Sequence, residues 1–124
     1  MFSGAHVLFF SRDAEADRAF FRDILGLPFV DAGHGWLIFQ LPPSEAAVHP
    51  VDAGSTMAGP GAMLPAEVYL MCDNLDAALA ALKAKGVECE PVREERWGRL
   101  SRMKLPSGGA LGYYEPRHPV AREL

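Results

Sequence analysis

The chain contains two stretches in which an apolar run is followed by a helical pattern of hydrophobic positions. Residues 4–13, GAHVLFFSRD, are mostly apolar and end in polar residues, which is typical of a buried strand that leads into a helix. Ala16, Phe20 and Ile24 then follow at four-residue spacing and share one helix face. Because Asp13 suits an N-cap, the helix is predicted to begin directly after it and to end at the next glycine.

The second half of the chain repeats this arrangement. Residues 66–74, AEVYLMCDN, are again an apolar run that ends at a capping residue. Beyond them, apolar side chains recur at the three- and four-residue steps of one helix face. These side chains are Leu75, Ala78, Leu79 and Leu82. The sequence therefore predicts two similar strand–helix units.

The repeat extends beyond the helices. WLIFQLPPS at 36–44 resembles WGRLSRMKLPS at 97–107, and Trp36 and Trp97 are 61 residues apart. The stretches EAAVHP and GGALGYYEP come next and are interpreted as closing strands. Each half of the chain is therefore predicted to contain a strand, a helix and three further strands.

These elements predict an α+β fold of two βαβββ modules, at about residues 4–50 and 66–116. Residues 51–65, rich in glycine, proline and alanine, are predicted to link the modules or to cover a site. A small open sheet leaves an apolar face exposed, so the two modules are expected to pack together. We therefore expect residues 1–124 to form one domain, with a curved mixed β-sheet around a central cavity.

Charge and composition argue against several classes of binding partner and cellular location. The net charge is −4 and the 12 lysine and arginine residues are scattered, which argues against nucleic acid and acidic membrane surfaces as partners. The longest apolar run is too short to span a bilayer, and no signal peptide is visible. Cys72 and Cys89 form no metal-binding or redox pattern. We expect a cytoplasmic protein.

Equivalent positions of the two modules can converge on one cavity. Gap-free alignment of HVLFFSRD with EVYLMCDN pairs His6 with Glu67, and the closing strands pair His49 with Gly112. Two histidines and one carboxylate suit a divalent first-row metal ion such as Fe, Mn, Ni or Zn, with open positions for water or a chelating substrate. His6, His49 and Glu67 are therefore the predicted metal ligands.

Each of these ligands also has a simpler interpretation. A lone histidine such as His6 is more often a core side chain bonded to a backbone carbonyl. His49 precedes a proline and would face solvent at a strand end, a position that a register shift of one residue would also give it. Glu67 would be a surface carboxylate at the start of a strand. The coincidence of all three at matched positions favours a functional site.

Strand alternation adds an apolar body to this polar cluster. Leu8 and Phe10 share the face of the first histidine, whereas Tyr69 and Met71 share that of the glutamate. Such a combination of a polar end and an aromatic body is typical of small-molecule sites. The predicted pocket residues are Leu8, Phe10, Trp36, Met71 and Tyr113. Glu67 is the candidate general base if it is not a ligand, with Tyr69 assisting proton transfer.

Four other residues are predicted to lie outside the site. His34, in DAGHGW, is expected in a turn, and His118 in a disordered polar tail. Cys72 is expected to be buried and inert. Glu115 would face away from the cavity on a regular strand, unless a bulge turns it inward.

The chain resembles the vicinal oxygen chelate superfamily, which includes glyoxalase I, extradiol dioxygenases, fosfomycin resistance enzymes and bleomycin resistance proteins. The resemblance covers about residues 4–116. It is carried by GAHVLFFSRDAEADRAFFRDILGLPF, VYLMCDNLDAALAALKAKGVECE and KLPSGGALGYYEP. It implies a homodimer, with sites near the subunit interface. It does not fix the activity, because this fold hosts unrelated chemistries.

The resemblance implies metal positions one residue at a time. His6 matches the ligand on the opening strand. Glu67 lies where the family usually has a histidine, and Gly112 lies where it usually has a glutamate. His49 lies where glyoxalase I has a carboxylate and many dioxygenases have no ligand. These departures argue against a standard glyoxalase I or extradiol dioxygenase.

Three functions are compatible with these observations. The first is a metal-dependent lyase, isomerase, transferase or oxygenase whose metal acts as a Lewis acid on a chelating, oxygen-rich substrate. The second is a metal-free protein that binds and sequesters a drug-like ligand, with Glu67 as counter-charge. The third is an assembly role alone, which is disfavoured because unused polar residues would cost stability. Stoichiometric bound metal would distinguish the first from the second.

Overall fold

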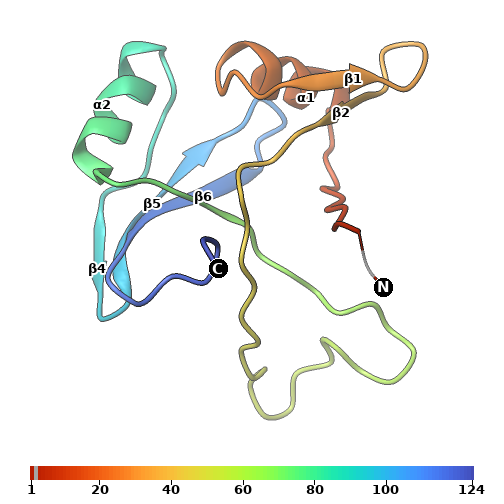
Figure 1. Ribbon diagram of the computed structural model, residues 1–124, viewed down its shortest axis with the longest axis vertical. Helices are drawn as coiled ribbons and strands as arrows, with labels where there is room; N and C mark the ends of the chain where they lie inside the picture. Colours follow the sequence, from red (N-terminus) through yellow and green to blue (C-terminus); the bar gives the residue numbers. More distant parts are fainter. Residues whose placement is uncertain (2) are drawn as a thin grey trace.

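The computed structural model describes residues 1 and 3–124, which contain two helices and six strands (Figure 1). The elements of the first half are α1 (Ala14–Asp23), β1 (Phe29–Asp31) and β2 (Leu37–Phe39). Those of the second half are β3 (Tyr69–Met71), α2 (Leu75–Ala84), β4 (Arg93–Glu95), β5 (Gly98–Lys104) and β6 (Ala110–Pro116). Within the described residues, no helix has the length and apolar character needed to cross a bilayer.

The second half forms the βαβββ module that its sequence predicts. Its sheet has the strand order β3-β6-β5-β4, in which β3 runs parallel to β6 and the other pairs are antiparallel. Leu75 of α2 is fully buried and belongs to one core cluster with Met103, Leu111 and Tyr113 of the sheet. Burial of these side chains supplies the main driving force that holds the helix on the sheet.

Both helices begin at the predicted caps. The side chain of Asp13 accepts a hydrogen bond from the Ala16 amide at 3.1 Å, and that of Asn74 accepts one from the Ala77 amide at 3.0 Å. These bonds satisfy amide groups that the first helical turn leaves without a partner. The first helical residues, Ala14 and Leu75, differ by 61 positions (75 − 14), the same offset as the two tryptophans.

The first half differs from its prediction in two strands. Only β1 and β2 pair, as an antiparallel two-stranded sheet. Residues 4–10 and 45–50, predicted to lie in the opening and closing strands, belong to no ladder. The physical reason is the lack of a partner edge: neither range makes a backbone–backbone hydrogen bond with any other residue that the structure describes. A strand needs such a ladder, whatever its side-chain pattern.

The two free edges of the larger sheet differ in character. β4, at one edge, carries Arg93, Glu94 and Glu95. Arg93 pairs with Glu95 at 2.9 Å, and Glu94 pairs with Arg99 at 2.8 Å and with Arg117 at 3.0 Å. The opposite edge is β3, whose sequence is Tyr-Leu-Met.

The segment between the modules runs away from the sheets, as Figure 1 shows for the yellow-green part of the chain. Residues 51–65 contain neither helix nor strand. The C-terminal tail lies against the residues that precede this segment, because the amides of Ala121 and Arg122 donate to Oε1 of Glu45 at 2.9 and 3.3 Å.

The predictions for the four residues expected outside the site are partly confirmed. His34 lies in a turn with φ of +52°, and Glu115 accepts a hydrogen bond from the Leu75 amide at 3.0 Å, so both predictions are confirmed. Partial burial raises the pKa of the Cys72 thiol, as expected for an inert side chain. The prediction for His118 is wrong: its ring stacks on Tyr114 and its Nε2 lies 3.0 Å from the tyrosine hydroxyl, which anchors the tail.

Candidate functional site

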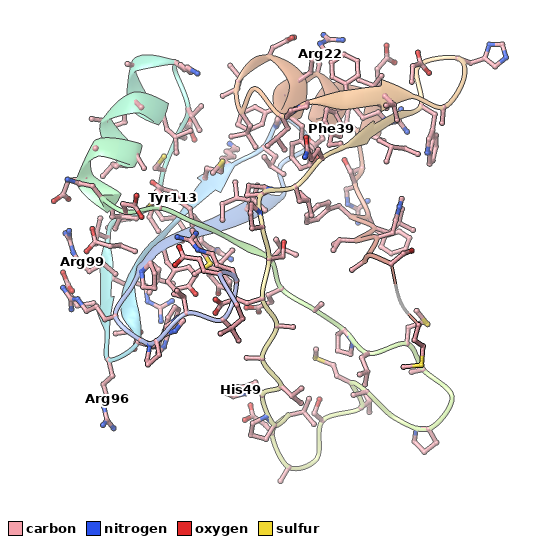
Figure 2. All side chains as sticks on the ribbon, viewed as in Figure 1. Arg22, Phe39, His49, Arg96, Arg99 and Tyr113 are labelled. Atoms are coloured by element: carbon pink, nitrogen blue, oxygen red, sulfur yellow. The ribbon has the colours of Figure 1, made fainter. Side chains whose placement is uncertain are left out.

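A cleft of about 800 Å³ lies in the first half of the molecule. Its walls are residues 5–11, α1, β2 with the residues that follow it, and part of the 105–110 turn. The lining is mainly apolar and aromatic, and includes Leu8, Phe10, Phe21, Trp36, Ile38 and Phe39. Figure 2 shows Phe39 below α1, at the inner side of this region. A concave, mostly apolar site with few polar groups is typical of small-molecule binding.

Aromatic contacts fix one wall of the cleft. The ring of Phe21 meets the edge of Phe9 at a centroid distance of 5.7 Å and that of Phe39 at 5.5 Å. Such edge-to-face pairs add to the stabilisation that burial alone provides. Phe21 therefore joins residues 5–11 to β2 through α1.

Asp17 of α1 connects three walls of the cleft by hydrogen bonds: α1 itself, residues 5–11 and the 105–110 turn. Its Oδ2 accepts a hydrogen bond from Ser11 Oγ at 2.7 Å, and its Oδ1 accepts one from the Ser107 amide at 3.0 Å. The residue is only 8% exposed, so these donors replace water around its carboxylate. Asp17 thus positions residues 5–11 and the 105–110 turn against α1.

Arg18 follows Asp17 on the helix and also lines the cleft. Its guanidinium carbon lies 4.5 Å from the centroid of the Trp36 ring, which is a cation–π geometry. It forms no ion pair with another residue in the described part of the chain.

The structure distributes the five predicted pocket residues over two places. Leu8, Phe10 and Trp36 line the cleft. Met71 and Tyr113 do not, because they belong to β3 and β6 of the other half. Tyr113 is 3% exposed in the core, and burial raises its pKa to about 12. Its hydroxyl is buried and bonds to no described residue.

The three predicted metal ligands lie apart within one chain. His6 lines the cleft. His49 lies on the segment that runs away from the sheets, far from Phe39 (Figure 2), and its Nδ1 is 2.7 Å from the Pro50 carbonyl oxygen. Glu67 accepts a hydrogen bond from the Tyr69 hydroxyl at 3.0 Å. Among the described residues, no three His, Cys, Asp or Glu side chains gather closely enough to hold a metal ion. The donor set of a single chain therefore does not fit a metal.

The space beside Gly112, the position for which the resemblance implies a glutamate ligand, is filled by an aromatic ring. Gly112 is the register partner of Tyr69, and a Cβ atom at position 112 would collide with that ring. The Tyr69 hydroxyl stays protonated, because partial burial and its hydrogen bond to Glu67 raise its pKa. The Glu67–Tyr69 pair is thus formed as a hydrogen bond, but it lies outside the residues that line the cleft.

Sequence reasoning missed Asp17 and Arg18. A signal was present for Asp17: it precedes Phe21 by four residues and so shares the buried helix face, where a carboxylate needs partners. No signal in the sequence places Arg18 over Trp36, because the two belong to different elements.

One comparison with known proteins identifies a superfamily, and another identifies the fold. The sequence profile of the Glyoxalase/Bleomycin resistance protein/Dioxygenase superfamily matches residues 4–110. No curated protein matches the chain in sequence. Several solved structures share its fold.

Three of these structures cover nearly the whole chain. TnmS3, an antibiotic binding protein from Streptomyces sp. CB03234, is 24% identical, with a TM-score of 0.61 over 94% of this chain and 99% of its own. Lactoylglutathione lyase from Agrobacterium tumefaciens is 20% identical, with a TM-score of 0.61 over 91% and 93%. A glyoxylase/bleomycin resistance protein/dioxygenase domain from Frankia sp. EAN1pec is 20% identical, with a TM-score of 0.60 over 94% and 100%.

These likenesses support the predicted α+β fold of two βαβββ modules with a curved mixed sheet. The profile match spans both modules, including the first-half segments that form no ladder here. The chain belongs to the glyoxalase/bleomycin resistance protein/dioxygenase superfamily.

Proposed function

We propose that the protein binds a small, mainly apolar, aromatic ligand in the cleft between residues 5–11, α1 and β2. The observation that carries this proposal is the lining: aromatic and aliphatic side chains surround about 800 Å³, with few polar groups among them. Burial of aromatic surface against such walls provides affinity, and the few polar groups provide orientation.

The antibiotic binding protein TnmS3 offers a parallel for this function. At 24% identity the likeness supports the fold alone, and this fold hosts several chemistries. The proposal therefore rests on the cleft. The relative serves only as an example of a protein with this fold that is described as binding a ligand.

Binding is proposed to need no metal. His6, the one predicted ligand that lines the cleft, has neither His49 nor Glu67 among the other lining residues. The metal-dependent enzyme stays a prediction that requires another arrangement of these three side chains. A dependence of ligand affinity on added metal would favour the enzyme.

The proposal can be tested with 2-naphthamide, a neutral bicyclic aromatic compound, by isothermal titration calorimetry. We expect wild-type protein to bind it with the same affinity before and after dialysis against EDTA. Trp36→Ala should weaken binding at least about tenfold, because it removes a large aromatic wall. Trp97→Phe is the matched control: Trp97 is also 40% or more exposed but lies outside the cleft, so affinity should not change. Equal loss in both variants, or binding only with added metal, would contradict the proposal.

We also propose that two copies of the chain associate through the first-half segments that lack partners. Residues 4–10 and 45–50 have unpaired backbone groups within the described structure. They also expose apolar side chains: Leu8 is 58% exposed, Phe10 92% and Val48 97%. Segments with unpaired backbone groups are templates for pairing with another chain.

Light scattering after size-exclusion chromatography tests this association. Wild-type protein is expected at twice the chain mass of 13.5 kDa. Phe10→Asp should shift the population towards the monomer, because it places a charge in the apolar contact. Leu124→Asp, which changes an equally exposed apolar residue at the C-terminus, should leave the dimer intact. A monomeric wild type over the whole concentration range would refute the dimer.

A further inference from the structure

The cleft contains two charged side chains, one with hydrogen-bond partners and one without an ion-pair partner among the described residues. Among the described residues that line the cleft, Asp17 is the single aspartate or glutamate, and Arg18 is the single lysine or arginine. Asp17 is buried and both of its oxygens accept hydrogen bonds, from Ser11 and Ser107. Arg18 is half-buried, contacts the Trp36 ring and has no anionic partner in the described structure. The cleft therefore offers one cation that is available to a ligand.

We propose that the cleft selects aromatic ligands that carry a negatively charged group, such as a carboxylate, and that Arg18 binds this group. The inference rests on the proposed function, because it requires that an aromatic ligand occupies the cleft. It adds a chemical class: a planar apolar body with one anionic substituent at the end near Arg18.

The geometry of Arg18 suits this role. A guanidinium group that lies over an indole ring keeps its N–H donors directed outward in its own plane. Two of these donors can bind one carboxylate in a forked arrangement, which is stronger and more directional than a single neutral hydrogen bond. The contact with Trp36 also limits the motion of a long side chain, so less conformational freedom is lost when a ligand binds.

The rest of the molecule does not provide a general attraction for anions. The chain has a net charge of −4, so the overall field disfavours a negatively charged ligand. A preference for anions in this cleft would therefore come from Arg18 itself. A cationic ligand is disfavoured for a separate reason, because the guanidinium already covers a face of Trp36 that a cation would use.

The test compares 2-naphthoate with 2-naphthamide, two compounds of nearly the same shape that differ in charge. Calorimetry should show that wild-type protein binds 2-naphthoate at least about tenfold more tightly than 2-naphthamide, the size expected for a hydrogen-bonded charge pair. Arg18→Gln should abolish this difference, so that the variant binds the two compounds with equal affinity. Arg18→Lys should keep part of the preference, because it retains the charge without the planar fork.

Arg22→Gln is the matched control. Arg22 lies one turn further along α1, is exposed, and pairs with Asp23 at 2.7 Å, so its removal changes the net charge equally without altering the cleft. Both affinities should stay as in the wild type. Circular dichroism and a thermal melt of each variant establish that the fold is retained.

The outcomes separate the two proposals. Equal affinities for both compounds in the wild type, with no effect of Arg18→Gln, would overturn the selection of anions and leave the aromatic cleft standing. Equal loss of preference in Arg18→Gln and Arg22→Gln would assign it to net charge and also overturn the role of Arg18. If neither compound binds the wild type, the proposed function fails, and this inference fails with it.

Discussion

Replacing Gly112 by glutamate is expected to destabilise the protein by roughly 3 kcal/mol or more, rather than to create a metal ligand. Gly112 is buried on β6, directly opposite Tyr69 on β3, and the ring of Tyr69 leaves no room for a Cβ atom. A glutamate there would force the ring aside, and its carboxylate would lie opposite Arg102, which already pairs with Glu90 at 2.7 Å. The glutamate that the resemblance implies at this position is thus excluded by packing.

Urea unfolding monitored by circular dichroism measures this effect. Gly112→Ala alone should cost about 1–3 kcal/mol, because it introduces the same collision without the charge. Part of that cost should disappear in combination with Tyr69→Ala, since the clashing ring is removed. Gly109→Ala is the control, because its added methyl group would meet only the Ser107 hydroxyl, at 3.4 Å. A Gly112→Glu variant as stable as the wild type would show that the Tyr69 ring can move aside, and would contradict this prediction.

Asp17→Ala is expected to weaken both the fold and the cleft. The Ser107 amide and the Ser11 hydroxyl would lose their acceptor, which should cost about 1–3 kcal/mol of unfolding free energy. Because Asp17 joins residues 5–11 and the 105–110 turn to α1 by side-chain hydrogen bonds, the affinity for 2-naphthamide should also fall about tenfold. Asp17→Asn should restore most of both, since its amide can accept from one partner and donate to the other.

Urea unfolding and calorimetry on the same preparations test this prediction. Asp23→Ala is the control, because Asp23 lies on the same helix, is exposed, and bonds only to the neighbouring Arg22. It should change stability by less than about 0.5 kcal/mol and leave binding unchanged. Loss of stability in Asp17→Ala with normal affinity would mean that the cleft does not depend on these bonds.

Much of the fold could be predicted because it depends on local patterns. The capping residues Asp13 and Asn74 and the apolar spacing after them define both helices. The 61-residue repeat then indicates two modules, and the superfamily match over residues 4–110 agrees with that interpretation.

Strand pairing was harder to predict, because a pattern of side chains does not identify a partner edge. Residues 4–10 have the composition of a strand but no ladder, whereas residues 69–71 pair with β6 in the same kind of sequence. The same limit applies to the site. Leu8 and Phe10 line the cleft, but so do the residues between and around them from Ala5 to Ser11, so strand alternation does not explain their position. The placement of Arg18 over Trp36 depends on how two separate elements pack.

The ion pairs along β4 have a consequence for how large an assembly can become. Any strand that docked on this edge would strip water from Arg93, Glu94 and Glu95, and nothing in an apolar strand would replace that hydration. The sheet is therefore closed to growth on one side and open only beyond β3. Pairing through both edges of the larger sheet, which could continue from molecule to molecule, is thereby prevented at β4. The charges on β4 thus keep this edge of the larger sheet from pairing with a strand of another molecule.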